Sequence, residues 1–200
     1  MFFLETSNMT CSLPRSTKNM LFNRDKIILD LCGGTGAWSK PYKDAGYDVR
    51  LIDLPNDVRL LEYIPGMRVY GILAAPPCTI FSYARQRYGL PRYEELLTAT
   101  SIADACLRAV IIYKPKWWAL ENPRNKLRRY LGTPAMTFKQ WYFGDGQEKP
   151  TCLWGDFNPP KYRPGKRTKP STYKTSRQNA DTKDAITPAG FAKAFFEANQ

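Results

Sequence analysis

The 200-residue chain contains no histidine. Catalytic arrangements that need an imidazole, such as Ser-His-Asp and Cys-His pairs, are therefore excluded, and acid–base work falls to carboxylates, lysine, tyrosine or water. Cysteine is scarce too, with five residues, none of them within four positions of another. Because neither a disulfide framework nor a zinc knuckle is indicated, we expect reduced thiols and no metal.

Long apolar runs and acidic residues are also few. The N-terminal stretch has no apolar run long enough for a signal peptide, and no other window approaches the ~18 apolar residues of a membrane span. We therefore expect a cytoplasmic protein with no membrane partner. Eighteen Asp and Glu stand against thirty Lys and Arg, which leaves a net charge of +12. Such a surplus favours a polyanionic partner, with nucleic acid first among the candidates.

A core is available, since 43% of the residues are hydrophobic and 14% are aromatic. Short apolar runs alternate with amphipathic stretches, which predicts one α/β domain with a mostly parallel sheet covered on both faces. The predicted strands are 26–31, 47–54, 69–75 and 116–122, the predicted helices are 37–46 and 92–113, and 137–144 with 152–157 form an antiparallel edge. Around these elements we expect a lead-in at 1–24, one domain at 25–200, a basic proline-rich segment at 157–182 and a closing helix at 185–199.

A candidate nucleotide site follows the first predicted strand. That strand ends in Asp30, and the next turn carries Gly33, Gly34 and Gly36, which let the backbone approach a ligand at the carboxyl end of the sheet. The second strand ends in Asp53, whose carboxylate can accept both ribose hydroxyls. The spacing differs from the dinucleotide G-x-G-x-x-G and fits the turn of S-adenosylmethionine enzymes better. The alternative is an ordinary glycine-rich turn with a solvated aspartate.

Two candidate catalytic residues lie at the ends of the next two predicted strands. In "APPCTIFS" two prolines fix the backbone before Cys78, which places its thiol at the carboxyl end of the third strand. Glu121 follows the apolar run of the fourth strand, so the thiol and the carboxyl would face one crevice. The alternatives are a packed core cysteine and a capping or surface carboxylate. We interpret three further cysteines as structural: Cys32, Cys106 and Cys152.

These segments resemble motifs of the DNA cytosine-5 methyltransferases. "APPCTIFS" resembles their P-C-x-x-F-S motif, "LENP" their E-N-V motif with Pro123 in place of Val, and "LDLCGGTGAW" their D-L-F-x-G-x-G-G turn. Weaker matches follow in the family's order. "GDGQEKPTCLWG" resembles the Q-x-R-x-R strand, and "DAITPAGFAKAFFEA" resembles the closing N-A-V-P-x-x-x-A helix. The resemblance covers residues 26–199.

The resemblance implies a Rossmann-like, class I S-adenosylmethionine-dependent methyltransferase that acts on cytosine C5 in DNA. Cys78, positioned by Pro77, would add to C6 of a flipped base, while protonated Glu121 would donate to N3 and Asn122 would fix the Glu121 loop. The implied cofactor residues are Asp30, Cys32, Gly33, Gly34, Gly36, Trp38, Asp53, Leu54, Asp57 and Pro76. The substrate contacts that we expect are Ser82, Arg85, Arg124, Gln147 and Lys149. Further basic residues near the site could hold phosphates or be solvated surface charge: Arg87, Arg92, Lys126, Arg128 and Arg129.

The sequence departs from the family in two places. Only the segment 157–182 stands where members carry a large target-recognition region. This predicts low or short sequence specificity, targeting by a protein partner, or an unusual substrate such as single-stranded DNA, and short members of this kind are typical of bacteriophages. Lys149 and Thr151 also replace the two arginines of the Q-x-R-x-R motif.

Other functions on the same scaffold stay open. An RNA cytosine methyltransferase is one. Such enzymes usually use a Thr-Cys nucleophile in addition to a Pro-Cys, but the one Thr-Cys beside an apolar strand end is at Cys152, in the wrong order and context. A catalytically silent nucleic-acid-binding protein is another, and the presence of both Cys78 and Glu121 argues against it. The spacing of the motifs does not distinguish methyl from another transferred group.

Overall fold

One six-stranded sheet organises the protein. The computed structural model describes residues 22–82, 89–145, 148–166 and 186–200. Within them the strands lie in the order β2-β1-β3-β4-β6-β5. Their bounds are β1 Ile27–Leu31, β2 Asp48–Ile52, β3 Val69–Ala74, β4 Trp117–Pro123, β5 Met136–Lys139 and β6 Pro150–Asp156.

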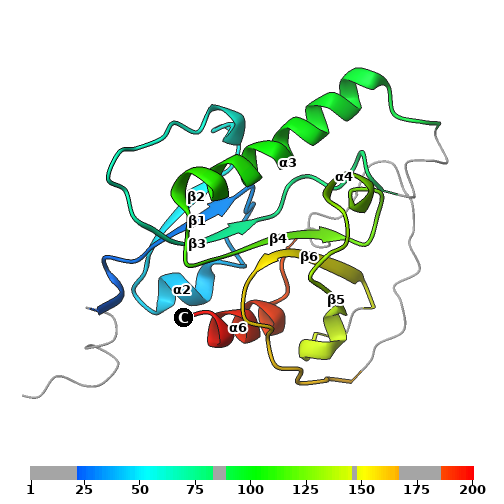
Figure 1. The fold of residues 1–200 in the computed structure, drawn as a ribbon. Coiled ribbons are helices and arrows are strands. Elements are labelled where there is room, and N and C mark those ends of the chain that lie inside the picture. Colours follow the sequence, from blue (N-terminus) through cyan, green and yellow to red (C-terminus); the bar gives the residue numbers. More distant parts are fainter. Residues whose placement is uncertain (1–21, 83–88, 146–147, 167–185) are drawn as a thin grey trace, which may run out of the picture.

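The direction of the strands changes once across the sheet. Strands β1 to β4 run parallel to their neighbours, and β6 runs antiparallel to both β4 and β5. This confirms the predicted mostly parallel sheet with an antiparallel edge. The carboxyl ends of β1 to β4 therefore meet at one edge of the sheet (Figure 1), where open α/β sheets place their ligands.

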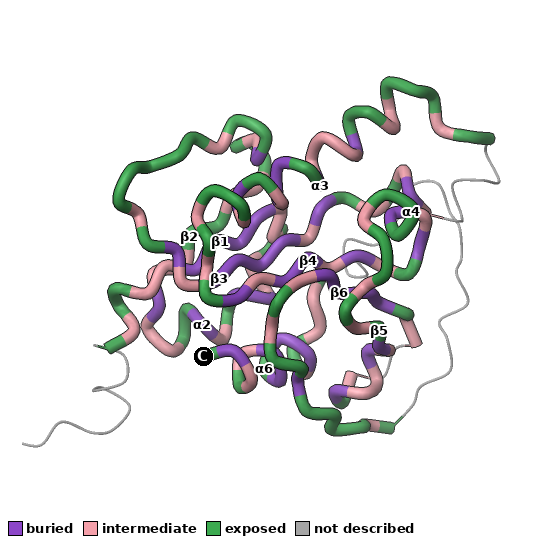
Figure 2. Tube along the Cα trace, viewed as in Figure 1, coloured by how far each residue is buried: buried purple, intermediate pink, exposed green. Residues whose placement is uncertain are grey.

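Helices cover the two faces of the sheet (Figure 1). Helix α3 (Tyr93–Tyr113) packs on one face, and α2 (Lys40–Asp44) and α6 (Ala189–Ala198) pack on the other. Successive strand residues point to opposite faces, so Leu29 belongs to the core under α3 and Ile28 to the core under α6. Figure 2 shows β1, β3 and β4 largely buried and the helices partly exposed.

Several elements are shorter than the sequence predicts. The helix expected over 37–46 is confined to α2, because the turn before it contains Gly36 at φ 70° and the helix begins only at Lys40. The strand expected over 137–144 ends at Lys139, and a 3-10 helix, η3 (Gln140–Phe143), follows. Two other short elements are η1 (Val58–Leu60) and α4 (Arg128–Leu131).

Helix α3 corrects the expectation that no segment has the length and apolar character of a membrane span. By length and composition it passes that test. The sequence reading missed it because small residues separate the large apolar side chains. In the structure those small residues form the face that packs on the sheet: Ala99, Ala103, Ala105, Cys106 and Ala109.

The closing helix α6 is fixed at its start by a carboxylate. Asp145 accepts hydrogen bonds from the backbone N–H groups of Gly190 (3.3 Å) and Phe191 (3.1 Å), two donors that a helix start otherwise leaves unpaired. A side chain at position 190 would overlap the carbonyl oxygen of Phe143. The predicted closing helix is therefore present, from Ala189 rather than 185, whereas 1–21 and 167–185 lie outside the described residues.

Candidate active site

The candidate site lies at the carboxyl ends of the parallel strands. Cys78 follows the end of β3 by four residues, and Glu121 lies inside β4. Because β3 pairs with β4 only as far as Ala74 opposite Leu120, Glu121 is the first residue of β4 beyond that ladder. Both side chains therefore stand where the sheet opens, as the sequence predicts.

Cys78, Glu121 and Lys149 lie within electrostatic reach of one another. Burial raises the pKa of the Cys78 thiol; the Lys149 ammonium opposes that rise and Glu121 adds to it. Burial also raises the pKa of the Glu121 carboxyl, and Lys149 again opposes the rise. Glu121 and Lys149 line one open cleft, together with Thr151 of β6. The site thus holds a thiol, a carboxyl whose pKa burial raises, and a cation.

Asn122 joins the thiol segment to β4. Its buried side chain donates from Nδ2 to the carbonyl oxygen of Pro76 (2.8 Å) and accepts at Oδ1 from Nδ2 of Asn125 (2.5 Å). Farther along the segment, the Lys126 N–H donates to the carbonyl oxygen of Phe81 (3.1 Å). A buried polar network whose members are paired holds its parts in one arrangement. Asn122 is therefore a positioning residue that fixes the Cys78 segment against the strand of Glu121.

The glycine turn after β1 is built tightly around Asp30. The Asp30 carboxylate is fully buried; Oδ2 accepts from the Ser39 hydroxyl (2.5 Å) and Oδ1 has no partner. A Cβ at Gly33 would overlap that carboxylate, and Gly34 and Gly36 have φ of 56° and 70°. The turn therefore needs glycine at these positions, and the predicted approach of a ligand to its backbone stays a prediction.

Asp53 fixes the same turn from β2. Its carboxylate accepts from the backbone N–H of Gly34 and from that of Leu54 (2.7 Å). Asp57 is engaged locally, because its carboxylate accepts from the Arg59 backbone N–H (2.9 Å) and pairs with the Arg59 guanidinium (2.5 Å). The cofactor contacts expected of Asp53 and Asp57 stay predictions.

Two residues expected to contact the cofactor have clear places in the packing. Trp38 is 1% exposed, and its ring packs against those of Phe191 (5.7 Å) and Phe195 (5.4 Å), so it supports the turn from the core. Cys32 adopts φ 56° and packs against the core that contains Cys106. Cys106 and Cys152 are themselves buried, as the structural interpretation of these cysteines requires.

The turn suits a cofactor without phosphate. From position 27 to 39 the chain has no Lys or Arg, and the carboxylates of Asp30 and Asp53 face the turn. This negative local charge disfavours a phosphate and favours a ligand with positive charge, as the sulfonium and amine of S-adenosylmethionine have. The residues present therefore fit S-adenosylmethionine. Among the described residues no three Asp, Glu or Cys side chains gather in a way that could hold a metal ion.

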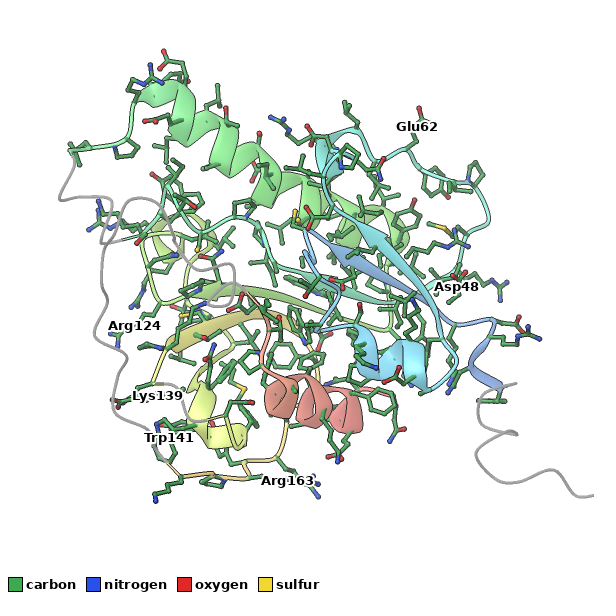
Figure 3. All side chains as sticks on the ribbon, turned by 180° about the vertical axis from the view of Figure 1, so that it is seen from behind. Asp48, Glu62, Arg124, Lys139, Trp141 and Arg163 are labelled. Carbon is green, nitrogen blue, oxygen red and sulfur yellow. The ribbon has the colours of Figure 1, made fainter. Side chains whose placement is uncertain are left out.

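Basic side chains flank the same edge of the sheet. Arg124 is exposed directly after β4, and its backbone N–H donates to the carbonyl oxygen of Pro150 (2.9 Å). Figure 3 shows Arg124 and Lys139 on one side of the molecule and Asp48 and Glu62 on the other. Of the remaining predicted substrate contacts, Ser82 and Lys149 are partly buried near the site, and Arg85 and Gln147 lie outside the described residues.

Comparison with known proteins gives the fold a context. No family model matches the chain, and no curated protein matches it. Among solved structures, one similar chain is described as a DNA modification methyltransferase encoded within a prophage (E. coli), with 17% identity and a TM-score of 0.48. The match covers 65% of this chain and 46% of that one, so this chain spans about half the length of its neighbour.

The arrangement of the sheet defines the class of fold. Four parallel strands are followed by a reversed strand, β6, which lies between β4 and the edge strand β5. Together with helices on both faces, this is a Rossmann-like α/β fold with an antiparallel edge.

Asp30 makes stability depend on pH. Burial raises its pKa to about 6, nearby Asp53 adds to the rise, and the Ser39 hydrogen bond opposes it. Because the folded state binds the proton more tightly than the unfolded state, the free energy of unfolding should fall by about 3 kcal/mol as pH rises from about 4 to 6. Asp30→Asn keeps an acceptor for Ser39 and should remove this fall in urea titrations. The exposed Asp44→Asn is the control, and an unchanged pH slope in Asp30→Asn would contradict the assignment.

Proposed function

We propose that this protein transfers a methyl group from S-adenosylmethionine to C5 of cytosine in DNA, with Cys78 as the nucleophile and Glu121 as the acid. The observation that carries the proposal is the meeting of Cys78, Glu121 and Lys149 at the carboxyl ends of β3, β4 and the start of β6. The glycine turn with Asp53, one and two strands away in the same sheet, supports it.

The residues account for activation of the base. Cytosine C5 is a poor nucleophile, and addition of the Cys78 thiolate to C6 makes it enamine-like. As the S–C6 bond forms, the ring electrons move toward N3, which takes the proton of Glu121. A carboxyl that stays protonated near neutral pH suits this task, and the raised pKa of Glu121 favours that form. Lys149 favours the thiolate of Cys78.

The reaction ends with release of Cys78. When bound, S-adenosylmethionine supplies an electrophilic methyl group for C5. The C5 proton then leaves to a base, for which we expect water because the chain has no histidine. The electrons of that C–H bond re-form the C5–C6 double bond, the S–C6 bond breaks, and the thiolate of Cys78 is restored. The proton on N3 returns to Glu121.

The substrate that best fits the charges is DNA with its target base flipped out. A base within a duplex cannot reach the cleft, and extrusion costs a few kcal/mol that backbone contacts can offset. Exposed basic residues stand close to the site along the chain: Arg124, Arg128 and Arg129. RNA cytosine methyltransferases usually use a Thr-Cys nucleophile in addition to a Pro-Cys, but Cys152 is buried in β6 with its sulfur beside Thr137 (3.8 Å). This favours DNA.

Nucleoside mass spectrometry tests the proposal. Purified protein is incubated with S-adenosylmethionine and mixed-sequence duplex DNA, single-stranded DNA or RNA, and the nucleosides are then analysed. We expect 5-methylcytosine in DNA from the wild type and from Cys152→Ala, the matched cysteine control. Methylation of a ring nitrogen or amino group, of RNA alone, or no product from protein that binds the cofactor would refute the proposed reaction.

A further inference from the structure

The short segment after β4 presents an exposed aromatic ring among basic side chains. Tyr130 of α4 is 51% exposed. From position 122 to 144 the chain has no Asp or Glu. Three exposed arginines and one partly buried lysine directly precede the ring: Arg124, Lys126, Arg128 and Arg129. None of these four side chains makes a hydrogen bond or an ion pair with any residue that the structure describes. Their positive charge is therefore available to a partner.

Tyr130 is joined to the segment that carries Cys78. Its ring packs on the buried ring of Phe81, with centroids 5.8 Å apart. The backbone N–H of Phe81 donates to the carbonyl oxygen of Cys78 (3.1 Å), and the Lys126 N–H donates to that of Phe81 (3.1 Å). Since these contacts place α4 beside the turn of Cys78, the nucleotides next to a base that meets Cys78 come close to Tyr130.

The segment that holds Tyr130 is fixed at both ends. Leu127, directly before α4, is fully buried in the core under α3, and its backbone N–H donates to Oδ1 of Asn125 (2.9 Å). Directly after α4, the carbonyl oxygen of Gly132 accepts from Nε1 of Trp154 in β6 (3.0 Å). The ring is therefore held in place before any ligand arrives, which lowers the entropy that binding costs.

An exposed ring among unpaired cations suits a strand with free bases. Lys and Arg bind the phosphates of any nucleic acid. An aromatic ring, in contrast, stacks on the face of a base, and every base has such a face. In a duplex these faces are covered by the neighbouring base pairs, so only an unpaired strand can use the cations and the ring together.

We propose that Tyr130 and the four basic residues before it form a binding surface for single-stranded DNA, on which the Tyr130 ring stacks with a base next to the target cytosine. The inference rests on the proposed function and names the form of its substrate. In an unpaired strand the target base needs no extrusion from a duplex. Stacking also reads little sequence, which agrees with the short segment 157–182 that stands in place of a recognition region.

Fluorescence anisotropy of a labelled oligonucleotide tests the surface. One sequence is prepared as single-stranded DNA, as duplex DNA and as single-stranded RNA, and is titrated with wild type, Tyr130→Ala, Tyr130→Leu and Tyr63→Ala. Tyr63 is the matched control, because it is 55% exposed and its ring packs on that of Tyr113 at 5.7 Å. It follows Glu62, which lies across the molecule from Arg124 (Figure 3).

We expect the wild type to bind single-stranded DNA more tightly than the duplex. Tyr130→Ala should weaken binding of the single strand by about 5- to 100-fold and leave duplex binding nearly unchanged. Tyr130→Leu should do the same, because leucine still covers Phe81 but has no ring to stack. Tyr63→Ala should bind as the wild type does.

The salt dependence separates the cations from the ring. Tyr130→Ala should keep the wild-type slope of log affinity against log salt concentration, because it removes no charge. A triple variant, Arg124→Gln with Arg128→Gln and Arg129→Gln, should make the slope for single-stranded DNA shallower by about 2, since each phosphate contact contributes about 0.7.

Tighter binding of the duplex, equal losses on both DNA forms, no loss in either Tyr130 variant, or an unchanged slope in the triple variant would overturn the proposal. Tighter binding of single-stranded RNA would assign the surface to RNA and overturn it as well. Failure of the proposed function gives a different result, because binding is measured without methyl transfer. Binding as expected with no 5-methylcytosine formed would refute the reaction and leave the binding surface in place.

Discussion

Cys78→Ser should lower the methylation rate by at least about 10⁴-fold while leaving cofactor affinity and melting temperature near their wild-type values. A serine hydroxyl needs a base to become a nucleophile, and the chain has no histidine to act as one. Its volume is close to that of cysteine, and the segment is held by the Asn122 hydrogen bond to Pro76 rather than by the sulfur. The loss would therefore report chemistry and not folding.

The measurement for Cys78 is a single-turnover rate with excess protein, beside Cys152→Ala. That control also removes a thiol of raised pKa, but one buried in β6. Cys152→Ala should keep most of the rate. Residual activity of Cys78→Ser within tenfold of the wild type would exclude Cys78 as the nucleophile.

Glu121→Gln should slow methylation by about 10²- to 10⁴-fold, the usual contribution of a positioned acid. The amide can still donate a hydrogen bond to N3, but it cannot transfer a proton. Loss of the carboxyl should also lower the pKa of Cys78, because Glu121 raises it. Glu148→Gln, which removes a carboxylate paired with Lys139 instead, is the matched control and should keep the rate near that of the wild type.

The pH profile gives a sharper test of Glu121. The active form needs a neutral Glu121 and an ionised Cys78, and burial raises both pKa values. If the carboxyl titrates first, kcat/KM rises up to the pKa of Glu121, stays level and falls above the pKa of Cys78. In Glu121→Gln no carboxyl titrates on the acidic side of the profile, so kcat/KM should keep rising with pH until the Cys78 thiol ionises. If the variant instead levels off at the same pH as the wild type, another group controls the acidic side of the profile.

The sequence could predict the placement of the two reacting groups because strand ends are local signals. Cys78 follows an apolar run and two prolines, Glu121 ends another apolar run, and parallel strands bring such ends to one edge. The contact that joins the Cys78 segment to the strand of Glu121 could be predicted only in part. Asn122 was expected to fix the Glu121 loop, but its partner, the Pro76 carbonyl oxygen, lies 46 positions away in the chain. No local pattern specifies that contact.

Other features depend on packing that a pattern does not carry. Gln140 lies in what reads as a continuous strand, and only the break into η3 and its burial reveal it as a wall of the cleft. Trp38 follows the glycine turn and was expected at the cofactor, whereas the aromatic rings of α6 draw it into the core. The ion pair of Asp57 with Arg59 joins residues two positions apart. It forms because Asp57 precedes the 3-10 helix η1 and its carboxylate accepts from the Arg59 backbone N–H.

The most direct test is the mass of the protein after reaction with DNA containing 5-fluorocytosine and S-adenosylmethionine. Fluorine at C5 cannot leave as a proton does, so the final elimination is blocked and the Cys78–C6 bond persists. We predict a covalent complex whose mass is that of protein plus DNA plus one methyl group, with peptide mapping to Cys78. An adduct at another residue, an adduct without the methyl group, or no adduct from cofactor-bound protein would contradict the account.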